Sequence, residues 1–235
     1  NISKSMLAWQ KFGNNETPES TAMKGDHFVG KYYVRYNTEL QKQVEELVTQ
    51  GVNRKEAEKM TPIVEEVSQM TVKWEANDPE TLSLWNKMND WVYAGFETTF
   101  NNIGVDFERH YKESEYYIKG KDFVMEGVDK GIFHKKDDGA VFVDLTDEGL
   151  DEKILVRSDG TSVYITQDMG IAQARYEDYA FDQMIYVVGQ EQDYHFQVLK
   201  EVIKKLGNDY SDSIMHFSYG MVSLPEGKMK SREGT

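Results

Sequence analysis

The order of strand and helix is clearest in Tyr186-Val-Val-Gly-Gln-Glu-Gln-Asp-Tyr-His-Phe-Gln197. An apolar, β-branched run ends at Gly189, polar residues follow, and a helical pattern then extends over 193–206. The same order is expected upstream, with a strand at 162–166 and a helix at 168–178. Further strand-like runs lie at 184–188, 214–217 and 221–222. This alternation of strands and helices predicts βαβ units and a parallel sheet.

Between the helix expected at 116–130 and this region, the pattern changes to a small antiparallel excursion. Residues 132–156 contain two β-branched runs, at 140–145 and 154–156. Asp137-Asp-Gly139 supplies the turn, because Asp and Gly favour the backbone angles of tight hairpins. A short strand is also expected at 105–107.

The first hundred residues are expected to be mainly helical. Helices are predicted at 1–12, 36–50, 53–73 and 78–101, with a polar connection at 17–30. Asn53 is expected to cap the third of them. The last helix carries a broad apolar face at helical spacing, which is typical of a buried core rather than a ligand site. Its members are Leu82, Trp85, Met88, Trp91, Val92, Phe96 and Phe100.

Composition limits the kinds of partner. The 235 residues carry a net charge of −14, so a nucleic acid would be gripped through a confined patch or by another part of the protein. The chain has no Cys, no apolar run long enough for a membrane span and no secretory start, which fits a reducing, cytoplasmic compartment. It opens without Met inside an amphipathic helix, which suggests a fragment.

A basic island lies near the C-terminal end of this acidic chain. Lys228, Lys230 and Arg232 stand between Gly227 and Gly234. Cationic side chains on a glycine-bounded loop can close over a polyphosphate and stabilise charge that develops during a reaction. The island is not a P-loop, since Met229 stands where Ser or Thr would hold magnesium. The plainer interpretation is a solvated basic turn.

Two further polar stretches are expected at the carboxyl ends of strands, where open α/β sheets bind ligands. Tyr164 and Asp168 fall where the strand at 162–166 would give way to its helix, with Thr166 as the N-cap. Gln192 and His195 follow the strand at 184–188. Asp168 could instead pair with the helix dipole, and His195 could be a packed or capping histidine. The other histidines show no metal spacing, so no zinc or other metal site is predicted.

Together these stretches resemble the arginyl-tRNA synthetases, which belong to class I. Lys228-Met-Lys-Ser-Arg232 is similar to the KMSKS signature, with Ser231 at the second lysine position. The runs Asp159-Gly-Thr-Ser-x-Tyr-x-Thr-x-Asp168 and Val188-Gly-x-x-Gln-x-x-His195-Phe are also typical of the family. So are Ser3-Lys-Ser-Met6 and Gly25-Asp-His-x-x-Gly-x-Tyr-Tyr33.

The resemblance implies an α/β fold: the second half of the class I Rossmann-like nucleotide-binding domain, with a helical insertion and a small antiparallel β excursion. Its expected parts are the end of the first catalytic half at 1–24, the insertion at 25–85 and the second catalytic half at 86–235. The family's HIGH signature is not in this chain, and the anticodon-binding domain would follow the KMSKS-like loop. We therefore expect negligible activation by this chain alone.

The resemblance also implies an activity: ATP-dependent activation of L-arginine to arginyl-adenylate and its transfer to tRNA(Arg), by a cytoplasmic monomer using Mg²⁺ bound to ATP. Tyr164, Asp168 and Gln192 would bind arginine. The catalytic cations would be Lys228, Lys230 and Arg232. The ATP-binding residues would be His195, Met221, Val222, Lys228 and Ser231.

Two alternatives remain open at this point. The helices at 36–101 could form a non-catalytic module that binds protein or tRNA, in which case Tyr164, Asp168 and Gln192 should tolerate change. A class I synthetase of another specificity is the second alternative, and an apolar residue in place of Asp168 would have favoured it. Loss of arginine binding in a folded Asp168→Asn variant would discriminate among the three.

Overall fold

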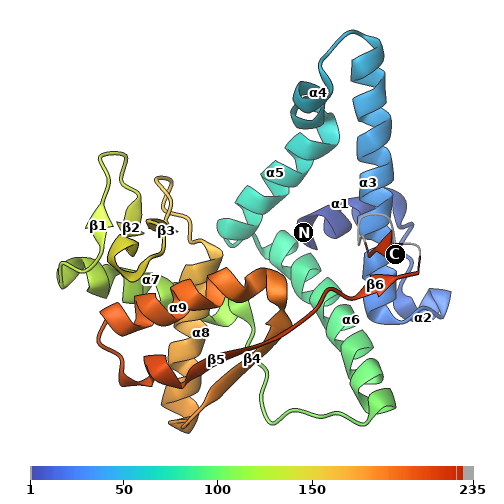
Figure 1. Cartoon of the computed structure of the whole chain (residues 1–235). Coiled ribbons are helices and arrows are strands. Elements are labelled where there is room, and N and C mark those ends of the chain that lie inside the picture. Colours follow the sequence, from blue (N-terminus) through green and yellow to red (C-terminus); the bar gives the residue numbers. More distant parts are fainter. Residues whose placement is uncertain (1, 226, 230–235) are drawn as a thin grey trace. The chain divides into compact units, whose positions relative to one another are not determined.

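The computed structural model describes residues 2–225 and 227–229. The chain packs as two compact units, one made of Asn1–Phe107 with Ser223–Thr235, the other of Glu108–Val222. Figure 1 gives the order of the elements along the chain. We refer to the first as the helical unit and to the second as the α/β unit, and describe each by itself.

The helical unit is built from helices joined by short turns. The elements are α1 (Ile2–Phe12), α2 (Pro18–Thr21), α3 (Gly25–Thr49), α4 (Arg54–Met60), α5 (Pro62–Glu75), α6 (Pro79–Ile103), and the antiparallel strands β6 (Ser223–Leu224) and β7 (Gly227–Lys228). The helices expected at 1–12 and 78–101 are confirmed as α1 and α6. The polar connection expected at 17–30 is wrong, because α2 and the start of α3 occupy it. The helix expected at 53–73 is interrupted at Thr61, since a proline at position 62 disfavours helical angles in the residue before it.

The core of the helical unit lies between α1, α3 and α6. Phe28 and Met88 are fully buried, and Trp91 packs edge-on against Phe28 and Trp9. The core interpretation of the α6 apolar face is therefore confirmed for Trp85, Met88, Trp91 and Val92. Leu82 lies outside this core cluster, and Phe96 is 43 % exposed. Gly25 allows α3 to touch α6: a Cβ there would lie 1.8 Å from the carbonyl oxygen of Trp91.

The α/β unit combines two small sheets with three helices. Its elements are α7 (Glu113–Asp129), β1 (His134–Lys135), β2 (Val141–Val143), β3 (Lys153–Val156), α8 (Tyr164–Tyr179), β4 (Met184–Gly189), α9 (Asp193–Lys205), β5 (Ile214–Tyr219), and the 3₁₀ turns Thr146–Glu148, Gln190–Gln192 and Asp209–Ser213. Strands β1, β2 and β3 form the predicted antiparallel excursion, and Gly139 supplies its turn with φ of +89°.

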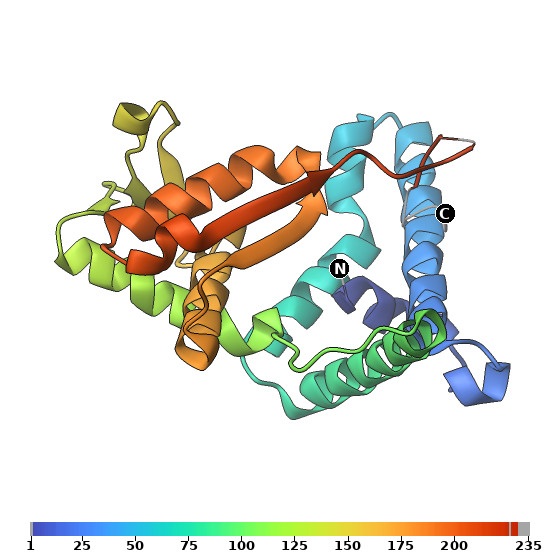
Figure 2. The same ribbon diagram turned by 60° about the horizontal axis from the view of Figure 1, so that its bottom comes forward.

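The predicted parallel sheet is confirmed by β4 and β5. Their register runs from Met184 opposite Ile214 to Gly189 opposite Tyr219, so both strands end at the same edge. Figure 2 shows the two strands side by side with α9 running along them. Met184 and Ile214 are buried in the core of the unit together with Leu199 and Val202 of α9.

Three strand predictions are wrong. The stretch 162–166 runs into the first turn of α8, which begins at Tyr164 after an N-cap at Val163. Thr166 is not the cap: it is fully buried, and its hydroxyl donates to the carbonyl oxygen of Leu155 in β3. Residues 105–107 and 221–222 form no strand. Short β-branched runs have only a weak backbone preference, and packing overrides it.

Helices α7 and α8 cross with their backbones in contact. A Cβ on Gly120 would lie 1.9 Å from the carbonyl oxygen of Thr166, and one on Gly170 would lie 2.6 Å from the amide nitrogen of Gly120. Only glycine fits at such a crossing. The contact fixes the second turn of α8, where Asp168 stands.

Candidate functional site

The carboxyl edge of the β4–β5 sheet brings together the candidate residues that follow its two strands. Strand β4 ends at Gly189, and the turn 190–192 leads into α9, so Gln192 and His195 lie just beyond the edge. Met221 and Val222 follow β5, which ends opposite Gly189. This edge is where parallel sheets of open α/β folds bind their ligands.

Asp168 and His195 form the central pair of the site. The Nε2 atom of His195 lies 2.6 Å from Oδ2 of Asp168, with the two side chains 24 % and 31 % exposed. A carboxylate only accepts, so Nε2 donates the proton of this bond. A carboxylate has about four lone-pair positions, which leaves Asp168 able to accept from a ligand as well.

The position of Asp168 in α8 bears on its capping alternative. Asp168 is the fifth residue of α8 and lies outside its first turn, where the helix has no acidic residue. The capping interpretation is therefore wrong. His195 packs edge-on against Phe196, with ring centroids 5.4 Å apart, but its polar end is committed to Asp168.

The structure places Tyr164 and Gln192 at the surface around this pair. Tyr164 is 76 % exposed and precedes Asp168 by four residues on α8, so both lie on the same side of the helix. Gln192 is exposed, and its side chain makes no capping bond to α9. Both side chains are thus free to turn toward a ligand.

His216 is a polar residue of this region to which the sequence analysis gave no role. It comes from β5, and its side chain is 10 % exposed. Its Nε2 lies 3.0 Å from the carbonyl oxygen of Val188, and its Nδ1 lies 2.9 Å from Oδ1 of Asp193. The sequence signal that could have revealed it is its spacing from Ile214. Residues two apart in a strand point to the same face, and Ile214 is buried.

Helix α8 also carries an arginine that packs between two tyrosine rings. The guanidinium of Arg175 on α8 lies 5.2 Å and 5.3 Å from the ring centres of Tyr111 and Tyr186. The hydroxyl of Tyr186 is buried, and burial raises the pKa of Tyr186 to about 12. This tyrosine therefore stays neutral in the folded protein over the ordinary pH range.

The basic island is described only in part. The backbone of Lys228 belongs to β7 and pairs with Ser223 of β6. Lys230, Ser231 and Arg232 lie outside the described residues, so their predicted roles are not tested. Met221 and Val222 are exposed, at 49 % and 59 %.

Over residues 2–225 and 227–229, no group of three or more His, Asp or Glu side chains is arranged to hold a metal ion. Within the same residues, no helix is both long and apolar enough to cross a membrane.

The sequence of the chain is similar to those of known proteins. Residues 15–235 match the family described as tRNA synthetases class I (R), catalytic domain. The whole chain is 58 % identical to the arginine–tRNA ligase of Bacteroides thetaiotaomicron and 55 % identical to that of Parabacteroides distasonis. In both cases it spans 39 % of the relative's length.

Solved structures show the same fold. The arginyl-tRNA synthetase of Plasmodium falciparum superposes with a TM-score of 0.65 at 17 % identity, over 94 % of this chain and 34 % of that one. That of Thermus thermophilus superposes with a TM-score of 0.64 at 16 % identity, over 97 % of this chain and 41 % of that one. The predicted class I synthetase fold is confirmed. From the family match over residues 15–235 it follows that the chain belongs to the class I tRNA synthetases of the (R) group and forms part of their catalytic domain.

Proposed function

We propose that the protein carrying this chain is an arginine–tRNA ligase, which activates L-arginine with ATP and transfers it to tRNA(Arg). The observation that carries the proposal is the Asp168 carboxylate, fixed by His195 at the ligand-binding edge of the sheet. The names of the relatives that match the whole chain support it. So does the parallel sheet, whose two strands end together beside this carboxylate.

The chemistry of the site suits a guanidinium. Its forked N–H donors pair best with a carboxylate, which Asp168 supplies. Gln192 would add an amide oxygen, and Tyr164 a ring or hydroxyl contact. A ligand lacking one of these donors leaves an acceptor unpaired, so citrulline should be rejected by on the order of 10⁴-fold.

The proposed reaction has two steps. The arginine carboxylate attacks the α-phosphorus of ATP, giving arginyl-adenylate with pyrophosphate as the leaving group. A ribose hydroxyl at the tRNA end then attacks the activated carbonyl, and AMP leaves. Both steps depend mainly on positioning and on stabilising negative charge.

The nucleotide would be bound by His195, Met221, Val222, Lys228 and Ser231. Lys228, Lys230 and Arg232 would act as the catalytic cations on the phosphates. Mg²⁺ would enter bound to ATP, because this ion is commonly held by substrate phosphates together with few protein ligands. We further propose that the enzyme works as a monomer in the cytoplasm. The division into parts at 1–24, 25–85 and 86–235 also stays a prediction.

The test is a calorimetric titration of arginine into a full-length synthetase carrying this chain and into its Asp168→Asn variant. Such a protein can be made by exchanging the matching segment of the B. thetaiotaomicron relative. Asparagine keeps an oxygen that can accept from His195 but removes the charge, so the fold should persist. We expect arginine affinity to fall by about 10³-fold, the cost of leaving a buried cation without its anion.

Circular dichroism of both proteins is the control for folding. Unchanged arginine binding in the folded variant would contradict the proposed function. As a second check, the 235-residue chain alone should show no ATP–pyrophosphate exchange, and measurable exchange would refute that expectation.

A further inference from the structure

A single imidazole, largely but not fully buried, spans the turn that carries Gln192. The segment 189–192, made of the last residue of β4 and the turn 190–192, joins Val188 to Asp193 at the start of α9. His216 reaches both of its ends: Nε2 lies 3.0 Å from the carbonyl oxygen of Val188, and Nδ1 lies 2.9 Å from Oδ1 of Asp193. The ring also packs on Phe196, with centroids 4.5 Å apart.

The two contacts restrict the same four residues, 189–192. Gln192 precedes Asp193 directly, and its side chain is exposed without a capping bond, so the turn itself must set its direction. A turn tied at both ends loses conformational freedom before a ligand arrives, which lowers the entropic cost of binding.

We propose that His216 is a positioning residue of the arginine site: it holds the 189–192 turn so that Gln192 meets the substrate guanidinium. This inference rests on the proposed function, because it needs Gln192 to contact arginine. His216 itself is placed on β5 beneath the turn, and it acts through Gln192.

The chemistry of the ring explains why histidine suits this place. Both neighbouring atoms are oxygen acceptors, a carbonyl and a carboxylate, and they lie at the two nitrogens of one rigid ring. A neutral imidazole donates an N–H to one of them, and an imidazolium donates to both. Phenylalanine would keep the packing on Phe196 but would offer neither donor. Glutamine would offer one amide group, which can donate to one of the two acceptors.

The experiment compares His216→Phe and His216→Gln in the full-length synthetase carrying this chain. Hydrogen exchange is measured by mass spectrometry, and ATP–pyrophosphate exchange gives KM for arginine and kcat. For His216→Phe we expect amides 189–193 to exchange about tenfold faster and KM for arginine to rise about tenfold, with kcat within about twofold. His216→Gln should recover part of both effects.

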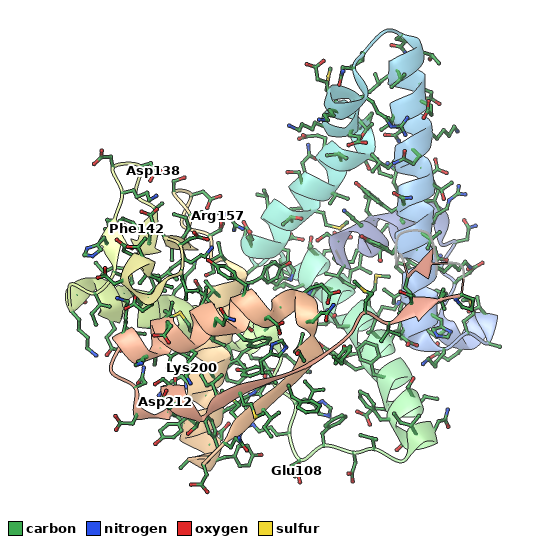
Figure 3. All side chains as sticks on the ribbon, viewed as in Figure 1. Glu108, Asp138, Phe142, Arg157, Lys200 and Asp212 are labelled. Carbon is green, nitrogen blue, oxygen red and sulfur yellow. The ribbon has the colours of Figure 1, made fainter. Side chains whose placement is uncertain are left out.

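The matched control is Lys200→Ala. Lys200 lies on the same helix, α9, and its Nζ lies 3.2 Å from Oδ1 of Asp212. Figure 3 labels both residues. This exposed pair has no contact with the turn. Its loss should leave both exchange at 189–193 and the KM for arginine unchanged.

Unchanged exchange at 189–193 in His216→Phe would overturn the proposal. So would faster exchange with an unchanged KM for arginine, because the turn would then be held without positioning the substrate. A different result would show that the proposed function itself fails: the Asp168→Asn variant would then bind arginine as tightly as the parent. In that case the hydrogen-exchange comparison would still report whether His216 holds the turn.

Discussion

In each unit a glycine allows two helices to cross with their backbones in contact, but the two crossings have different consequences. In the helical unit, Gly25 of α3 meets the backbone of α6 at Trp91, among aromatic side chains of the core. In the α/β unit, Gly120 of α7 meets α8 at Thr166, two residues before Asp168. The first crossing therefore stabilises a core, whereas the second also sets the position of a site residue.

Polar side chains differ between the units in the same way. In the helical unit, Thr17, Asn53 and Asp78 bond to backbone groups two or three residues away and cap helices. In the α/β unit, Asp168 and His195 are 27 residues apart, and His216 reaches Val188 over 28 residues. Local bonds define where helices begin, whereas the long-range pairs assemble a site.

The largest expected effect is on the two crossings. Gly120→Ala and Gly25→Ala each force a Cβ against a backbone oxygen less than 2 Å away, so we expect each to cost about 3 kcal/mol of unfolding free energy. Urea unfolding measures this. Only Gly120→Ala should also weaken arginine binding, because it displaces the turn of α8 that carries Asp168.

Gly30→Ala is the control for these two variants. A Cβ at this exposed position of α3 meets nothing within 4 Å, so alanine should leave stability unchanged or raise it slightly through its helix propensity. Equal weakening of arginine binding by Gly25→Ala and Gly120→Ala would remove the distinction between the crossings.

Two buried threonines give the next largest contrast. Thr166 donates to the carbonyl oxygen of Leu155, whereas the Thr61 hydroxyl in the helical unit is buried without a hydrogen-bond partner. Thr166→Val leaves a buried acceptor unpaired and should cost about 2 kcal/mol, while Thr61→Val should be neutral or stabilising. Thermal unfolding of the pair checks this, and a loss of similar size in both variants would contradict it.

Two tyrosines with raised pKa values should make the folded protein less stable at alkaline pH. The pKa of Tyr186 is raised to about 12 by burial, and that of Tyr32 is raised to about 12 by burial and by its bond to Glu16. In the unfolded chain each tyrosine loses its proton at a pKa near 10, before the folded protein does. The free energy of unfolding is therefore unaffected below pH 10 and falls as pH rises toward 12. We expect Tyr186→Phe to recover about 1 kcal/mol at pH 11.

At neutral pH the two phenylalanine variants should differ. Tyr32→Phe loses the 3.0 Å bond to Glu16, so it should destabilise the protein, whereas Tyr186→Phe keeps the ring that packs against the Arg175 guanidinium and should cost less. Urea unfolding at pH 7 and pH 11 measures both. A Tyr186→Phe variant as alkali-sensitive as the parent would contradict the burial argument.

The smallest expected effect is at a helix cap. The side chain of Asn53 accepts from the backbone N–H of Lys55 at 3.0 Å, on an exposed turn. Asn53→Ala should cost about 0.5 kcal/mol and Asn53→Asp should restore it, with no change in arginine binding in either variant. A change in arginine affinity would mean that the caps of the helical unit also shape the site.

The sequence by itself determined the features that depend on neighbours along the chain. The helices α1 and α6, the Asn53 cap, the hairpin at Gly139 and the strands β4 and β5 all follow from local spacing and turn chemistry. The motifs around Asp168 and His195 also indicated the family, which the family match confirms.

Only the tertiary structure decided the start of α8, the pairing of Asp168 with His195, and the place of His216. Residues 162–166 have a strand-like composition, but Thr166 bonds to β3 and Gly120 packs against its carbonyl, and these contacts favour a helix. Likewise, hydrogen bonds between residues more than 20 positions apart leave no periodic signal in the sequence. They form because the parallel sheet brings the ends of β4 and β5 to one edge, and packing energy outweighs local backbone preference.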